Sequence, residues 1–127
     1  MLKHIAAFVS LLCALPLCSA EATGDGWISL FDGQTLAGWK ASENPGSFKV
    51  ADGAIVAHGP RAHLFYTGDV QGADFRNFEL QAEVNAGRNA NSGIYFHTAW
   101  QETGFPGKGF EVQVSNSAEM RNNYVER

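Results

Sequence analysis

The chain has 127 residues, of which 45% are hydrophobic, and its formal net charge is −4. This length suits one domain, and an acidic chain without a basic cluster lacks the positive charge that nucleic-acid binding requires. Fourteen glycines and many aromatic residues, combined with short alternating runs, favour an all-β protein. We therefore predict a single all-β domain that does not bind nucleic acid.

Residues 1–20 have the pattern of a secretory signal peptide. Lys3 supplies a positive start, residues 5–17 form an apolar stretch, and small residues precede the expected cleavage point after Ala20. The apolar stretch is too short to span a bilayer comfortably. The pattern predicts a secreted or periplasmic protein with no membrane span.

The chain has two cysteines, Cys13 and Cys18, and both lie within residues 1–20. The mature chain would then have no disulfide, no thiolate zinc site and no cysteine nucleophile. Lipid attachment at Cys18 is an alternative to simple secretion. We favour secretion, because Leu17 is bulkier than the residue that usually precedes a lipidated cysteine.

The first part of the mature chain contains short apolar stretches separated by turn residues. Five of them are predicted to be strands: 27–31, 36–39, 48–51, 54–57 and 64–67. Asp52-Gly53 separates the third stretch from the fourth, which is a hairpin signal. A structural role is therefore favoured for Asp52 over contact with a ligand.

His58, Arg61 and His63 follow this hairpin in a loop-like region. The intervening Gly59-Pro60 excludes the helical spacing of two histidines that bind a metal ion. Both histidines are therefore interpreted as surface residues. Arg61 could contact an anionic or carbonyl ligand, but a solvated side chain is the favoured interpretation.

Residues 76–85 have the clearest strand pattern of the chain. Four apolar residues at alternate positions are expected to face the core, while the polar residues between them face water or a cleft. The apolar set is Phe78, Leu80, Ala82 and Val84, and the polar set includes Glu79 and Glu83.

Two further strands, 92–98 and 110–114, are predicted to place polar side chains on one shared face. Alternation turns their apolar residues inward: Ile94, Phe96, Phe110, Val112 and Val114. The opposite face would carry Tyr95, His97, Glu111 and Gln113. The polar tail 115–127 offers no closing strand, so residues 110–114 are expected at an open edge. Regularly spaced short strands indicate an antiparallel β-sandwich or jelly roll.

Four stretches occur in the order found in one known family. They are Leu30–Trp39 (LFDGQTLAGW), Phe78–Leu80 with Glu83, Asn91–Phe96 (NSGIYF) and Gly109–Val114 (GFEVQV). On these stretches the chain resembles the 3-keto-disaccharide hydrolase family. The resemblance implies a concanavalin-like jelly roll that continues beyond Val114. Residues 21–127 would then be the N-terminal part of such a domain, and the fold would be incomplete at its C-terminus.

The resemblance also implies a carbohydrate substrate, namely a glycoside oxidised to a ketone at C3 of the sugar ring. The ketone acidifies the C2 proton, so that a base can remove it and the glycosidic oxygen can leave from C1. Such a site requires a base, an acid for the leaving oxygen and a group that stabilises the enolate. A divalent metal ion could supply the last of these.

The predicted polar face supplies candidates for these tasks. Glu111 is the first candidate for the base or for a metal ligand, with a solvated outer-face glutamate as an equal alternative. His97 could act as an acid or base or as a metal ligand, and an exposed strand histidine is its alternative. Tyr95 and Gln113 would bind or stack on the sugar, although both could be ordinary sheet-surface residues.

Glu83 is added to the substrate-binding residues because it could meet Glu111 across strands. Glu79 lies four residues before Glu83, about 13 Å away on a strand, which is too far for the two to flank one glycosidic bond. Glu79 is therefore expected to be solvated. Asn91 and Ser92 are expected to shape the turn before their strand rather than to touch substrate. Arg88 is interpreted as a mobile loop residue, with contact to a ligand as the weaker alternative.

The favoured interpretation is a secreted hydrolase that acts on 3-keto-glycosides. A carbohydrate-binding module of the same fold is the first alternative, because the same surface would bind a sugar without cleaving it. A non-catalytic adhesion or structural sandwich is the second alternative.

Overall fold

The computed structural model describes residues 25–116 and the strand at 124–126. In this part of the chain there is no α-helix, and seven strands pair in antiparallel fashion in three small sheets. The sheets are β1 (Trp39–Ala41) with β4 (Leu64–Tyr66), β2 (Phe48–Ala51) with β3 (Ala54–Ala57), and β5 (Asn91–Phe96), β6 (Phe110–Ser115) and β7 (Tyr124–Glu126). Two 3-10 helices, η1 (Pro45–Ser47) and η2 (Val70–Ala73), lie in the connections.

The all-β, antiparallel class is therefore confirmed, whereas the jelly-roll strand order stays a prediction. The signal peptide predicted for residues 1–20, with both cysteines, lies outside the described residues. Among the residues that are described, no helix has the length and hydropathy needed to cross a bilayer.

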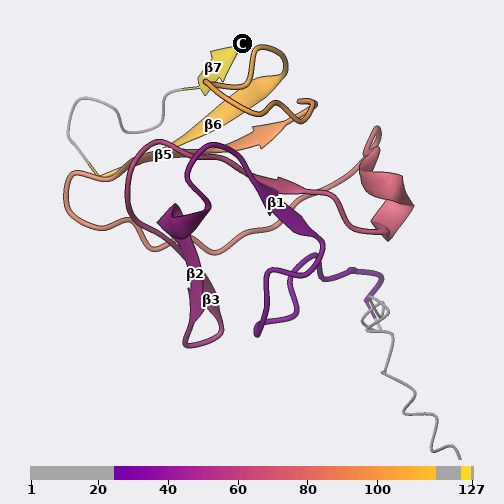
Figure 1. Cartoon of the computed structure of the whole chain (residues 1–127). Helices are drawn as coiled ribbons and strands as arrows, with labels where there is room; N and C mark the ends of the chain where they lie inside the picture. The colour runs from indigo at the N-terminus through magenta and orange to yellow at the C-terminus, as the bar shows by residue number, and fades with distance from the viewer. Residues whose placement is uncertain (1–24, 117–123, 127) are drawn as a thin grey trace, which may run out of the picture.

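The β2–β3 hairpin forms as the sequence predicts and extends away from the β5–β7 sheet (Figure 1). Asp52 and Gly53 have φ angles of 51° and 74°. Both central residues of the turn are thus left-handed, which matches the right-handed twist of the two strands. The structural role predicted for Asp52 is confirmed.

Residues 27–31, which were predicted to be a strand, form only a single bridge at Ile28. The reason is local hydrogen bonding, which competes with strand pairing. The Ser29 hydroxyl donates to the Phe31 carbonyl at 2.6 Å. The Trp39 indole then donates to the Leu30 carbonyl at 2.8 Å, which fixes this segment against the start of β1.

Asp32 organises the turn that follows. Its carboxylate accepts hydrogen bonds from the Thr35 hydroxyl (2.6 Å), the Thr35 amide (2.7 Å) and the Gln34 amide (2.8 Å). These bonds, that from the Thr35 hydroxyl first, hold the pKa of Asp32 below its usual value. The turn residues between the first two apolar stretches are thus held by the Asp32 side chain.

Residues 76–85 are not a strand, although their pattern was the clearest in the sequence. All ten are exposed, and Phe78, Leu80 and Val84 are 41%, 48% and 50% exposed. Alternation specifies which side of a strand is apolar, but a strand forms only where a neighbour takes up its backbone hydrogen bonds. No described strand pairs with this segment, and the prediction was wrong for that reason.

The prediction that residues 110–114 form an open edge was also wrong. β7 pairs with β6 on the side away from β5, in the register Phe110↔Glu126 to Val112↔Tyr124. Figure 1 shows the three strands side by side. A polar stretch thus becomes a strand because β6 offers it a ladder of hydrogen bonds.

Apolar packing within the described residues is shallow. Apart from Pro106, no described apolar side chain is fully buried. Rings in mutual contact take the place of a deep core, for example Phe96 stacked on Phe110 with centroids 5.3 Å apart. The buried residues of the described part also include three polar ones: Ser42, Ser47 and Glu111.

Candidate functional site

Glu111 is the centre of the candidate site. It lies on β6 directly opposite Tyr95 of β5, and it is only 5% exposed. The alternative of a solvated outer-face glutamate is therefore wrong. Burying a carboxylate is costly, so this placement indicates a role other than surface solvation.

Gly93 provides the space for the Glu111 side chain. A Cβ atom at position 93 would overlap Oε1 of Glu111 and would lie 2.6 Å from its Cγ. The Glu111 side chain therefore lies over Gly93 of β5, which is diagonal to its register partner Tyr95. This explains in physical terms why a glycine stands in the middle of the Asn91–Phe96 stretch.

Gln113 lies two residues beyond Glu111, on the same face and opposite Gly93. Its Nε2 donates to Oδ1 of Asn91 at 2.8 Å, which fixes the orientation of the amide. The structure thus brings together three of the predicted site residues: Tyr95, Glu111 and Gln113. Asn91, predicted to shape the turn, also supports this polar face.

His97 does not join them. β5 ends at Phe96, and His97 has a φ angle of 53°, which breaks the alternation on which the prediction depended. Its ring lies 5.6 Å from those of Phe78 and Phe96 and 6.4 Å from that of Phe110. His97 is therefore on the apolar side of the sheet, and its predicted place beside Glu111 was wrong.

Glu83 is also not brought to Glu111. It is exposed within the irregular segment 76–85, and Phe78 of that segment contacts Phe96 on the apolar side of the sheet. Among the described residues, no group of three or more His, Cys, Asp or Glu side chains is arranged to hold a metal ion. Glu111 and His97 do not form a shared metal site, because the two residues lie on opposite sides of the sheet.

His63, interpreted from the sequence as a surface histidine, is instead part of the site. It is half-buried, and its ring meets the Tyr95 ring edge to face, with centroids 5.5 Å apart. Its backbone is fixed at two points by Ser42, which is 1% exposed: the His63 amide donates to the Ser42 hydroxyl at 3.0 Å, and the Ser42 amide donates to the His63 carbonyl at 2.9 Å.

Arg61 and Glu43 form an ion pair next to His63. Nε and Nη2 of Arg61 each lie 3.1 Å from the Glu43 carboxylate. The hydrogen bond from Arg61, assisted by one from the Gly104 amide at 2.7 Å, holds the pKa of Glu43 below its usual value, and the same bond raises the pKa of Arg61. The Glu43 carboxylate, through its bond to the Gly104 amide, therefore attaches the 97–109 loop to the segment that follows β1.

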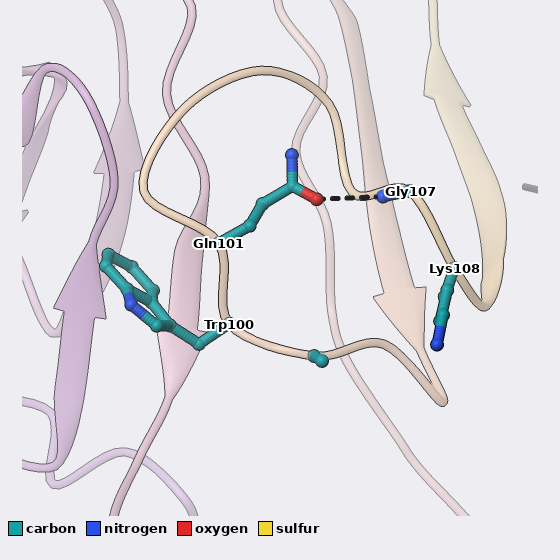
Figure 2. Close-up of a pocket in the computed structure, with 5 residues that line it drawn as sticks. Trp100, Gln101, Gly107 and Lys108 are labelled. Carbon is teal, nitrogen blue, oxygen red and sulfur yellow. Dashed lines mark hydrogen bonds between the residues drawn. The ribbon is translucent and has the colours of Figure 1, made fainter.

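The 97–109 loop is closed by Gln101 (Figure 2). The Gln101 side chain accepts from the Gly107 amide at 3.0 Å, and its Nε2 donates to the carbonyls of Thr103 and Phe105, each at 2.6 Å. These bonds place the Phe105 ring 5.6 Å from that of His63 and 5.2 Å from the Arg61 guanidinium. A shallow hollow of about 280 Å³ lies beside the loop, lined in part by Trp100 and Lys108.

The comparison with protein families gives a clear result. The model of the 3-keto-alpha-glucoside-1,2-lyase-like domain matches residues 26–126. The chain belongs to this family. A curated relative, the 3-keto-disaccharide hydrolase of Bacteroides thetaiotaomicron, is 35% identical over 81 residues, which cover 57% of this chain and 27% of the relative. The chain thus matches about a quarter of that protein's length. No solved structure matches it.

In this 3-keto-alpha-glucoside-1,2-lyase-like domain, the candidate site is a row of side chains, which we call the polar row. It starts at the buried carboxylate of Glu111, continues through Tyr95, His63 and Phe105, and ends at Arg61. The first two lie on adjacent strands of one sheet, and the others come from residues 61–63, which precede β4, and from the 97–109 loop. Tyr95 thus links the buried base candidate, its register partner Glu111, to the imidazole of His63, whose ring contacts its own.

Proposed function

We propose that the chain carries the active site of a hydrolase that cleaves 3-keto-glycosides, with Glu111 as the catalytic base. The family and the name of the curated relative support this class of reaction. The observation that carries the assignment to Glu111 is its burial on one face with Tyr95 and Gln113, across a glycine that leaves room for it. A carboxylate held in one place beside the substrate is suited to take up a proton from it.

The reaction starts with removal of the C2 proton of the sugar by the Glu111 carboxylate. The electron pair of the C2–H bond forms an enolate with the C3 ketone. It then forms the C1–C2 double bond as the glycosidic oxygen leaves C1 and takes up a proton. Water adds to C1 of the resulting enone, and C2 regains a proton. The net change is the addition of one water molecule across the glycosidic bond.

The other side chains of the polar row support these steps. Tyr95 and Gln113 hydrogen-bond to the sugar that lies over Glu111. His63 is the imidazole on this face, and we assign to it the proton donation to the leaving oxygen. His97 is not given this task, because its ring lies on the other side of the sheet.

Export of the protein belongs to the same proposal. A secreted or periplasmic location after removal of residues 1–20 is supported by the charge and hydropathy pattern of that segment. Processing can be checked by mass spectrometry of the protein recovered from the periplasm or the medium, where the mature chain is expected to begin at Glu21.

The test compares the unaltered chain with Glu111→Gln on a 3-keto-disaccharide, with release of reducing sugar as the readout. A general base contributes roughly 10²- to 10⁴-fold, so the variant should lose activity by at least about 10²-fold. Glu79→Gln is the matched control, because Glu79 is an exposed glutamate outside the polar row. Equal release by Glu111→Gln would remove Glu111 from the mechanism. Sugar binding without any product would indicate a carbohydrate-binding module.

A further inference from the structure

We propose that Phe105 and Arg61 form a second sugar subsite, which holds the leaving sugar of a disaccharide substrate. The inference rests on the proposed function, because it assumes that the sugar to be opened lies over Glu111. Beyond that function, the inference states where the leaving sugar lies and which side chains hold it.

The position of Phe105 in the polar row is the first argument. Tyr95 lies opposite Glu111, the His63 ring follows at 5.5 Å, and the Phe105 ring follows His63 at 5.6 Å. His63 is the residue assigned to the leaving oxygen. A ligand that extends from Glu111 past His63 therefore reaches Phe105 with the sugar beyond the scissile bond.

The chemistry of the two side chains is the second argument. A pyranose offers an apolar face of C–H groups and a rim of hydroxyl groups, so its site needs a ring surface beside hydrogen-bonding groups. The Phe105 ring is 51% exposed and lies 5.2 Å from the Arg61 guanidinium, whose side chain is 50% exposed. The ion pair of Arg61 with Glu43 uses Nε and Nη2, so the donors on Nη1 are outside it.

Charge identifies the ligand as a neutral sugar. Because Glu43 is paired with Arg61, the subsite has one carboxylate and one guanidinium in contact, and their charges compensate. An acidic sugar would therefore gain little from Arg61, whereas a hydroxyl group can accept a hydrogen bond from it.

The subsite is also held in place before a ligand arrives. Gln101 bonds to the Phe105 carbonyl, and the Gly104 amide bonds to Glu43. Preorganised side chains lose little conformational entropy on binding. The Trp100 ring, which is the other exposed aromatic of the loop, is less suited to a sugar because the Lys40 ammonium lies 3.9 Å from its centroid and the Phe65 ring packs against it.

The experiment compares kcat/KM for a 3-keto-disaccharide with kcat/KM for the methyl glycoside of the same 3-keto sugar. The methyl glycoside has no second sugar, so the ratio of the two kcat/KM values measures how much the second sugar contributes through the subsite. Phe105→Ala should reduce this ratio by about tenfold, the effect of losing one aromatic contact. Phe105→Leu, which keeps an apolar side chain for the His63 contact, should reduce it less. Phe78→Ala, an exposed phenylalanine outside the polar row, should leave it unchanged.

Arg61 is tested by Arg61→Lys, which keeps the positive charge for Glu43 but removes the planar fork. The ratio should fall for this variant as well, and Lys108→Arg is its matched control at an exposed cation. Circular dichroism spectra and thermal midpoints of all variants identify any that do not fold. A ratio that stays the same in folded Phe105→Ala and Arg61→Lys would overturn the subsite.

Failure of the proposed function gives a different result. If the unaltered chain turns over neither substrate, the hydrolase proposal fails, and the subsite is judged by equilibrium binding. Tighter binding of the disaccharide than of the methyl glycoside, with the difference lost in Phe105→Ala, would support it. Equal affinities of the unaltered chain for the two ligands would overturn it.

Discussion

Replacement of Gly93 by alanine is a sharp test of how Glu111 is held. The new Cβ atom would overlap Oε1 of Glu111 and would lie 2.6 Å from Cγ and 2.9 Å from Cδ, so the carboxylate must move. The φ angle of Gly93 is not among the positive ones, and the backbone therefore accepts an alanine. Overpacking costs about 1–3 kcal/mol, and the smaller backbone entropy of alanine offsets about 0.5–1 kcal/mol of this.

Gly93→Ala should therefore lower the free energy of unfolding by no more than about 2.5 kcal/mol, so that the variant stays folded, yet it should reduce kcat/KM strongly. A catalytic group displaced by about 1 Å can lose roughly 10²-fold in rate. The assays are urea unfolding and release of reducing sugar from a 3-keto-disaccharide. Gly46→Ala is the control, because a Cβ atom there meets nothing within 4 Å. Full activity of folded Gly93→Ala would refute the placement of Glu111 across β5.

Further predictions concern the groups that hold the site together. Glu43→Gln should speed hydrogen exchange at the Gly104 amide, whose bond to the Glu43 carboxylate is 2.7 Å; unchanged protection would contradict the role of Glu43 in fixing the loop. The hydrogen bond from Arg61 holds the pKa of Glu43 below its ordinary value of 4.5. The ionised Glu43 should therefore stabilise the folded chain fully above pH 4.5, and this stabilisation should be lost as the pH falls through the folded-state pKa. The thermal midpoints of the unaltered chain and of Glu43→Gln should therefore converge in acid, and a constant difference would count against this. Ser42→Ala leaves the His63 amide without its bond to the Ser42 hydroxyl and should cost about 1–3 kcal/mol in chemical unfolding; an unchanged free energy would be inconsistent with that bond.

Local patterns predicted those parts of the fold that depend on neighbours in sequence. Strands β5 and β6 follow from alternation, and the 52–53 turn follows from the residues that tolerate positive φ angles. The shared face of Tyr95, Glu111 and Gln113 follows from the same alternation, so three site residues could be placed correctly without coordinates.

Other parts depend on partners that the sequence does not reveal. Residues 76–85 alternate well but find no strand partner among the described residues, whereas the polar stretch of β7 does find one in β6. His97 left the polar face through a single positive φ angle, which no pattern of apolar residues could indicate. Periodicity describes the faces of a strand, but not whether the strand pairs or where it ends.

The missed residues of the polar row show the same limit. His63 and Arg61 reach the site because β4 pairs with β1 and because Glu43 bonds to Gly104, 61 residues further along the chain. A local signal was present only in Leu64–Tyr66, the apolar stretch that follows His63 and becomes β4. It indicated a strand beside the histidine, but not the face of the neighbouring sheet that this histidine would meet.

The central claim, proton removal from C2 by Glu111, is tested most directly with a 3-keto-disaccharide that carries deuterium at C2. Mass spectrometry of the released 3-keto sugar follows the label, and a sample without protein corrects for spontaneous exchange. The proposal predicts slower cleavage of the labelled substrate, loss of the deuterium to solvent during turnover, and cleavage and exchange that are at least about 10²-fold slower with Glu111→Gln. Cleavage at the same rate for both substrates, with the deuterium retained at C2 of the product, would contradict it.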